Sequence, residues 1–131
     1  MPITYSIDRA RRRLFTAAEG SVTYPEVMAH LEKERVDNGL PLNELVVATR
    51  AKVAFSPVDV RQVIKRLRDL GRHHALGPTA IVVDDDLSYG MMRMLEMLVE
   101  DVCDVRPFRN AGEAEAWLNT IPMPRPPTQV G

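Results

Sequence analysis

The sequence predicts one α/β domain with a mostly parallel sheet, an antiparallel N-terminal hairpin and the element order ββαβαβαβα. Two patterns and the chain length support this prediction. Short apolar runs typical of strands alternate with amphipathic segments that open on helix-capping residues, which favours right-handed crossovers and parallel pairing. A length of 131 residues suits one domain. We expect residues 1–120 to form it, and residues 121–131, with four prolines, to be a flexible tail.

The first two expected strands form the hairpin. Ile3–Asp8 alternates apolar and polar residues, with Tyr5 in the middle of the apolar face. Arg12–Ala18 contains residues that favour strands, and the polar residues 8–11 before it suit a tight turn. These two runs are therefore expected to pair antiparallel at the edge of the sheet.

A helix is expected after the hairpin. Thr23 and Glu26 have the spacing of a capping box, and Pro25 falls in the first turn, where its missing N–H does no harm. Asn38, followed by a glycine, is expected to end the helix at about Asp37.

The middle of the chain predicts a buried strand followed by the clearest amphipathic helix. Leu45–Thr49 is a valine-containing run typical of a strand buried on both faces. Ser56 and Pro57 suit the N-cap and first position of a helix that Gly71 is expected to end. One apolar stripe runs along this helix, formed by Val60, Val63, Ile64, Leu67 and Leu70.

The last third of the domain repeats the alternation of strand and helix. We expect strands at Thr79–Val83 and Val102–Phe108, and helices at Leu87–Asp101 and Asn110–Asn119, the last one capped by its asparagine. The acidic run Asp84–Asp86 resembles the opening of a response-regulator receiver domain, where such residues hold Mg²⁺. No later strand supplies the phospho-accepting aspartate of that family, so we expect these carboxylates to cap the following helix.

The helix expected at Leu87–Asp101 is apolar on more than one side. An ordinary core stripe is expected from Leu87, Met91, Met94, Leu95 and Leu98. Met92 and Val99 are expected to point elsewhere and to widen the apolar face. The helix is then either wedged between sheet and loops, or it presents an adaptable contact surface for a partner protein, a second copy or a lipid.

The net charge of −1 makes a polyanion such as nucleic acid an unexpected partner. It hides an uneven distribution, because residues 61–74 carry five basic residues and one acidic residue, whereas residues 84–104 carry seven acidic residues and one basic. Such segments are either solvated helix faces or surfaces that steer a complementary partner, including a second copy of the chain.

Residues that could carry catalysis or bind metal are few and scattered. The pair His73–His74 follows a helix-ending glycine, His30 stands alone on a helix, and Cys103 is expected to be buried near the start of a strand. No serine–histidine–aspartate order, glycine-rich phosphate loop or zinc-protease motif is present. We therefore expect no enzyme, no metal site and no cofactor. We also expect no membrane span and a cytoplasmic location.

Taken together, the elements resemble the SpoIIAA-like group of the STAS superfamily, which are small bacterial domains with this element order. The matching segments are residues 2–8 (PITYSID), 20–26 (GSVTYPE), 44–47 (ELVV), 55–60 (FSPVDV), 80–94 and 106–117. The resemblance implies a regulatory docking module in which phosphorylation of a serine at a helix start controls partner binding. Ser56 lies close to that position and is a candidate phosphosite, although the Asp-Ser-Ser-Gly-like motif of the family is absent here.

We expect a non-enzymatic docking module that binds a protein partner and forms a homodimer. The expected contact residues lie on the methionine-rich helix and around the start of the preceding helix, at Phe55, Ser56, Asp59, Met91, Met92, Met94 and Val99. The alternative is a carrier of a small apolar molecule or lipid, because a methionine-rich helix over a sheet can open an apolar pocket.

Overall fold

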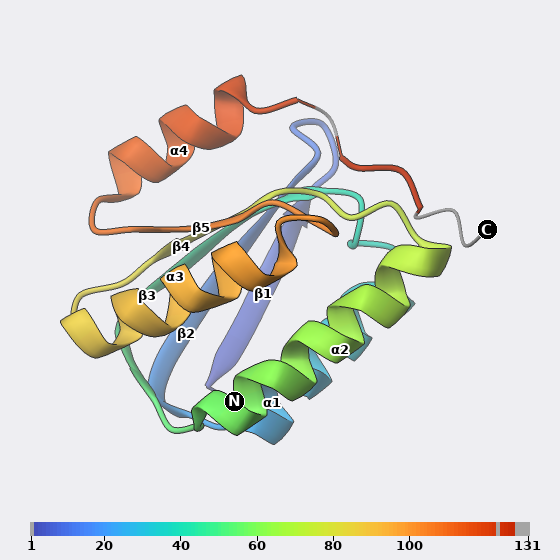
Figure 1. Cartoon of the computed structure of the whole chain (residues 1–131). Coiled ribbons are helices and arrows are strands. Elements are labelled where there is room, and N and C mark those ends of the chain that lie inside the picture. Colours follow the sequence, from blue (N-terminus) through green and yellow to red (C-terminus); the bar gives the residue numbers. More distant parts are fainter. Residues whose placement is uncertain (1, 123, 128–131) are drawn as a thin grey trace.

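The computed structural model describes residues 2–122 and 124–127, and its elements follow the predicted order (Figure 1). The strands are β1 (Ile3–Asp8), β2 (Arg13–Val22), β3 (Asn43–Val53), β4 (Thr79–Val82) and β5 (Val105–Phe108). The helices are α1 (Tyr24–Val36), α2 (Pro57–His73), α3 (Asp86–Val99) and α4 (Ala111–Thr120). The predicted α/β fold class is confirmed.

The five strands lie side by side in chain order. β1 and β2 pair antiparallel, and the later neighbours pair parallel, as predicted. From β2 to β5, each parallel strand is added on the same side of the one before it. Because each crossover is right-handed, the connecting helices then lie on one face of the sheet. Helices α1, α2 and α3 accordingly share one face, whereas α4 follows the last strand and covers the other (Figure 1).

The predicted helix starts are confirmed by their hydrogen bonds. The Glu26 carboxylate accepts the Thr23 N–H at 2.9 Å, Ser56 Oγ accepts the Asp59 N–H at 3.3 Å, and Asn110 Oδ1 accepts the Glu113 N–H at 3.0 Å. The predicted end of α1 is also confirmed, because Asn38 has a φ of 58° and reverses the chain after Val36.

Three expectations about the elements are wrong. β2 and β3 are longer than predicted, because they continue to pair as far as Val22 and Val53 beyond an irregularity near Ala17. β3 is not buried on both faces, since the short helix α4 leaves Val47 38% exposed. α2 also continues through Gly71, which is buried inside the helix and does not end it.

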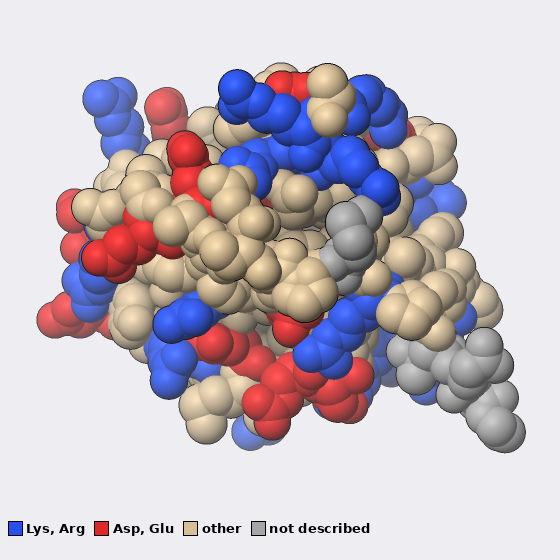
Figure 2. All heavy atoms as spheres, turned by 90° about the horizontal axis from the view of Figure 1, so that it is seen from above, with Lys and Arg blue, Asp and Glu red and all other residues tan. Residues whose placement is uncertain are grey.

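The two faces of the sheet carry cores of different size. The larger core includes the predicted α2 stripe and the inner side of α3. The smaller core lies beneath α4 and consists of Leu45, Ala80, Val82, Phe108, Ala114 and Leu118. Figure 2 looks onto the α4 side, where uncharged residues cover the middle of the face and charged side chains gather toward its margins. The buried polar groups described next lie on the opposite face of the sheet.

The start of the expected flexible tail is attached to the domain. Arg125 and Leu76 exchange two backbone hydrogen bonds of 3.1 Å, and the Arg125 guanidinium donates to both carboxylate oxygens of Asp104, at 2.9 and 3.3 Å. Arg125 thus contacts the domain, and the flexibility expected for residues 121–131 stays a prediction. Part of that expectation, at residue 123 and residues 128–131, lies outside the described residues.

Candidate functional site

A cavity of about 200 Å³ lies between the sheet and helices α1, α2 and α3. Most of its wall is aliphatic and comes from β2, β3 and the inner sides of the three helices. Polar side chains gather at one place in this wall, where Thr16, His30, Glu34 and Glu44 meet. We call these four residues the polar cluster.

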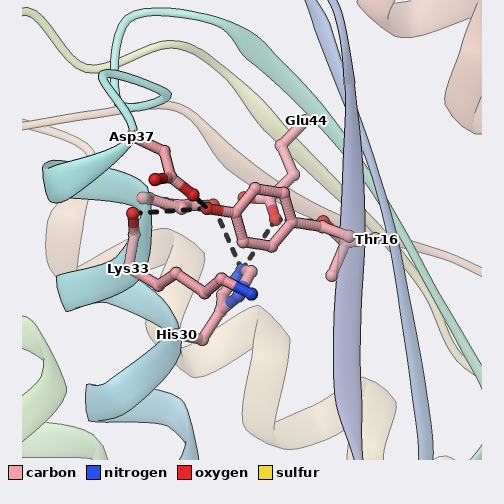
Figure 3. A network of polar contacts seen from close by, with 7 residues as sticks. Thr16, His30, Lys33, Asp37 and Glu44 are labelled. Carbon is pink, nitrogen blue, oxygen red and sulfur yellow. Dashed lines mark hydrogen bonds and ion pairs between the residues drawn. The ribbon is translucent and has the colours of Figure 1, made fainter.

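Strand and helix periodicity bring the polar cluster together. Thr16 on β2 pairs with Val46 on β3, and Glu44 lies two residues before Val46, so Thr16 and Glu44 point to the same face of the sheet. His30 and Glu34 lie one turn apart on α1 and therefore share the helix side that faces this sheet. Figure 3 shows the side chains of His30 and Glu44 pointing toward each other between α1 and the strands.

One carboxylate of the cluster is well paired and the other is not. Glu44 Oε2 accepts a hydrogen bond from Thr16 Oγ1 at 2.6 Å and lies 2.9 Å from His30 Nε2. Glu34 Oε1 lies 3.1 Å from the same His30 nitrogen, but it has no hydrogen-bond partner among the described residues. Since Glu34 is only 4% exposed, water has little access to this oxygen. An unpaired polar atom in such a position is costly.

The pKa values follow from this pairing. Burial raises the pKa of Glu34, and the charge of Glu44 raises it further, so it lies well above its ordinary value. Burial would also raise the pKa of Glu44, but the hydrogen bond and charge of His30, with Thr16, lower it. Burial lowers the pKa of His30, but the two carboxyl groups outweigh this effect and raise it to about 10. At neutral pH the cluster therefore holds a charged His30 and a charged Glu44, and Glu34 is the carboxyl group that keeps its proton to the higher pH.

Tyr5 on β1 closes the outer side of the cluster. Its ring meets the His30 ring edge-on, with 5.5 Å between the ring centres. Its hydroxyl donates to the carboxylate of Asp37 and lies 3.2 Å from the backbone oxygen of Lys33, at the end of α1 (Figure 3). Burial, with the hydrogen bond to Asp37, raises the pKa of Tyr5. Tyr5 therefore stays a neutral donor that fixes α1 against the edge of the sheet.

The expected orientation of the methionine-rich helix is wrong. Met92 and Val99 are 8% and 0% exposed and belong to the larger core, so they cannot form a contact surface. Leu87 and Leu98, expected in the core, are 67% and 45% exposed instead. Met91 and Met94, also proposed as contacts, are half-buried against the core.

The residues expected to contact a partner near the start of α2 differ in their exposure. Phe55 is half-buried and lines the cavity. Ser56 is exposed and acts as the N-cap, and the Asp59 carboxylate accepts a hydrogen bond of 3.0 Å from the Ser56 backbone N–H. Phosphorylation of Ser56 and partner binding through this segment stay predictions.

The acidic run before α3 has the capping role expected for it. Asp85 accepts hydrogen bonds from the N–H and the hydroxyl of Ser88 at 2.8 and 2.9 Å. Asp86 pairs with Arg109 at 2.6 Å. Cys103 is buried as expected, although it precedes β5, and burial raises its pKa to about 12.

The expectation that His30 stands alone is wrong. Its partner is Glu34, which follows four positions later in the sequence. Helical spacing places both residues on the same side of the predicted helix as Val27 and Leu31. A histidine and a glutamate in an otherwise apolar stripe indicate a buried pair. Thr16 and Glu44 carried no such signal, because their contacts with α1 depend on the strand register.

The segments of opposite charge are partly neutralised within the chain. Arg68 on α2 donates to both carboxylate oxygens of Asp101, at 2.6 and 3.1 Å, and Arg66 pairs with Glu32 on α1 at 3.1 Å. These exposed pairs add little to stability. They show that part of the expected charge complementarity is used inside the chain and not with a partner.

Comparison with solved structures supports the fold. The chain is similar to an uncharacterized protein of the DUF3478 family with a SpoIIAA-like fold from Shewanella loihica PV-4, with 20% sequence identity and a TM-score of 0.56. The similarity covers 88% of this chain and 93% of that protein. No protein-family model and no curated protein matches the sequence. The chain thus has a SpoIIAA-like fold. Among the described residues, no helix combines the length and apolar character needed to cross a membrane.

Proposed function

We propose that this chain is a non-enzymatic binding module that holds a small amphiphilic molecule in the cavity beneath α1, α2 and α3. The supporting observation is a largely apolar cavity whose wall contains the polar cluster. Ligand sites commonly combine a mostly apolar wall with a few polar groups that fix the orientation of the ligand. A volume of about 200 Å³ exceeds the roughly 150 Å³ of an engineered cavity that binds benzene. An alkyl chain or a ring therefore fits.

The polar cluster selects the head group of this molecule. Glu34 Oε1 is a buried acceptor without a donor, and Glu44 beside it is negatively charged. A head group that donates a hydrogen bond, such as an alcohol, satisfies Glu34. A carboxylate head has no hydrogen to donate to Glu34 Oε1 and is repelled by Glu44, whereas the charge of His30 is already paired with Glu44.

The prediction is that octan-1-ol binds the metal-free protein at least about tenfold more tightly than octanoate. Val46→Phe fills the cavity wall beside Glu44 and should weaken octan-1-ol binding about tenfold or more. Isothermal titration calorimetry in a buffer with EDTA measures both effects, and native mass spectrometry of the purified protein tests for a ligand carried from the cell.

Val47→Phe is the matched control, because Val47 is the next residue of β3 and points to the opposite face. It should bind octan-1-ol like the wild type. Equal losses in the two variants, or no binding of octan-1-ol by the wild type, would contradict the cavity as the binding site.

A second candidate function is self-association through the outer side of α3. Leu87, Met97 and Leu98 are 67%, 63% and 45% exposed there, next to half-buried Met91 and Met94. The chain also carries basic residues on α2 and acidic residues at both ends of α3. A second copy related by a two-fold axis would cover the apolar residues and bring opposite charges together.

Leu87→Lys combined with Met97→Lys should therefore weaken the dimer about tenfold or more without loss of folding, because both side chains are exposed. Sedimentation equilibrium at high micromolar concentration measures the effect. Val36→Lys changes an equally exposed apolar residue on α1 and should leave the dimer intact. A monomeric wild type would rule out this second function and leave the cavity proposal unaffected.

A further inference from the structure

His30, Glu34 and Glu44 have the composition and spacing of a metal site. A histidine nitrogen and two carboxylate oxygens, all within 4.8 Å of one another, are donors that zinc and related divalent metals prefer. His30 Nε2 lies 2.9 Å from Glu44 Oε2 and 3.1 Å from Glu34 Oε1. For metal bonds of about 2.0–2.1 Å, neighbouring donor atoms lie about 2.9 Å apart at an angle of about 90° and about 3.3–3.4 Å apart at the tetrahedral angle. The two distances in the cluster lie between these limits without being tetrahedral.

A second, independent observation is the unpaired oxygen of Glu34. This oxygen is buried, points into the cluster and lacks a hydrogen-bond partner among the described residues. His30 Nε2 cannot serve both carboxylates equally well, because it carries at most one proton and is hydrogen-bonded to Glu44. A cation between the three side chains gives every inward-facing atom a partner.

The balance of charge also suits a divalent cation. Metal binding displaces the proton of His30, and that of Glu34 where it is protonated, to solvent. Two carboxylates and one neutral imidazole around a doubly charged metal then sum to zero, which lowers the cost of burying the group. The hydrogen bond from Thr16 Oγ1 holds Glu44 in place, as an outer partner does for a metal ligand.

We propose that His30, Glu34 and Glu44 bind one divalent transition-metal ion, with zinc the expected occupant. Three protein ligands leave at least one coordination position for water or another ligand. All three side chains line the cavity, so this position is reachable from within it. The proposal needs only these side chains and does not depend on an amphiphile in the cavity.

The test is calorimetric titration of the EDTA-treated, dialysed protein with zinc chloride alone. We expect one zinc ion per chain. Glu34→Gln keeps the shape of the side chain but removes a ligand charge, and should weaken binding at least about tenfold, as should His30→Gln. His73→Ala combined with His74→Ala removes the other histidines and should leave the affinity unchanged.

X-ray absorption spectroscopy of the zinc-loaded wild type identifies the metal ligands directly, so this test does not depend on whether a variant folds. A single imidazole among nitrogen and oxygen ligands is expected, because His30 is the only histidine of the site. Two imidazoles, loss of binding in the His73/His74 variant, unchanged binding by folded Glu34→Gln, or no stoichiometric zinc would each overturn the proposal. None of these results bears on octan-1-ol binding, which is measured in EDTA.

Discussion

Glu44→Gln is expected to lower the free energy of unfolding of the metal-free protein by about 3 kcal/mol, whereas Glu34→Gln should leave it equal to the wild type or raise it by up to about 1 kcal/mol. Both substitutions replace a buried glutamate by its uncharged counterpart in the same cluster. The difference is expected because Glu44 is the ionised partner of His30 and Thr16, whereas burial and the charge of Glu44 favour the protonated form of Glu34. Urea denaturation at pH 7 in EDTA measures both values.

The size of the Glu44 effect follows from the buried pair. Loss of one partner from a buried ion pair usually costs about 3–5 kcal/mol, because the remaining charge is left without compensation. The low end applies here, since Glu34 Oε1 lies 3.1 Å from His30 Nε2 and can ionise to replace Glu44. Equal destabilisation by the two variants would contradict the assignment of the charge to Glu44.

The pH dependence of stability separates the same two carboxyl groups. Folding raises the pKa of Glu34 above 4.5 and that of His30 from 6.5 to about 10, so stability falls as the pH rises through these ranges. Folding lowers the pKa of Glu44, so its contribution is lost as the pH falls below 4.5. The cluster therefore favours folding most near pH 4.5, and its contribution declines above that pH through Glu34 and above pH 6.5 through His30 as well. Glu34→Gln should show a shallower loss of stability above pH 4.5 than the wild type.

The order of the elements could be predicted because its signals are local. The capping residues Thr23, Ser56 and Asn110 mark helix starts within four residues of sequence, and the strands between them are short apolar runs. The right-handed crossover rule then determines most of the arrangement. Nothing in these steps depends on contacts between distant parts of the chain.

The orientation of α3 could not be predicted, because the helix carries apolar residues on two sides. Leu87, Met91, Met94 and Leu98 have helical spacing, and so do Ser88, Met92, Leu95 and Val99. The second set is buried, although it contains the serine. Hydrophobic periodicity cannot choose between two such stripes, and the packing of α3 beside α2 and β5 decides.

Only two of the four residues of the polar cluster could be brought together from the sequence, because the other two depend on contacts between distant segments. His30 and Glu34 share one turn of a predicted helix, so their contact follows from sequence spacing. Thr16 and Glu44 reach the cluster through the pairing of β2 with β3, and the strand register is set by the whole sheet. A histidine in an apolar helix stripe therefore merits a search for buried carboxylates on neighbouring strands.

Gly77→Ala is expected to lower the free energy of unfolding by about 3 kcal/mol or more, or to prevent folding. A Cβ atom at Gly77 would lie 2.0 Å from the backbone oxygen of Leu42 and 2.9 Å from that of Pro41. Neither oxygen can rotate away as a flexible side chain does. The Gly77 N–H also donates to the backbone oxygen of Leu40 at 2.7 Å, so a shift that relieves the clash also strains this bond.

Gly90→Ala is the matched control within the same chain. Gly90 lies inside α3, and a Cβ atom there meets nothing within 4 Å. Alanine favours a helix interior over glycine by about 0.5–1 kcal/mol, so this variant should be more stable than the wild type by that amount. Urea denaturation of both variants gives the comparison.

The contrast between the two glycines tests how the segment before β4 is held. Gly77 lies between Leu76, which pairs with Arg125, and the proline that precedes β4. Gly77 packs closely against residues 40–42 at the end of the α1–β3 loop. Through the neighbours of Gly77 in the chain, this loop is therefore connected to the segment around Arg125 and to β4. A loss of less than about 1 kcal/mol in Gly77→Ala would mean that this junction moves apart at little cost, and would contradict the close backbone packing on which the prediction rests.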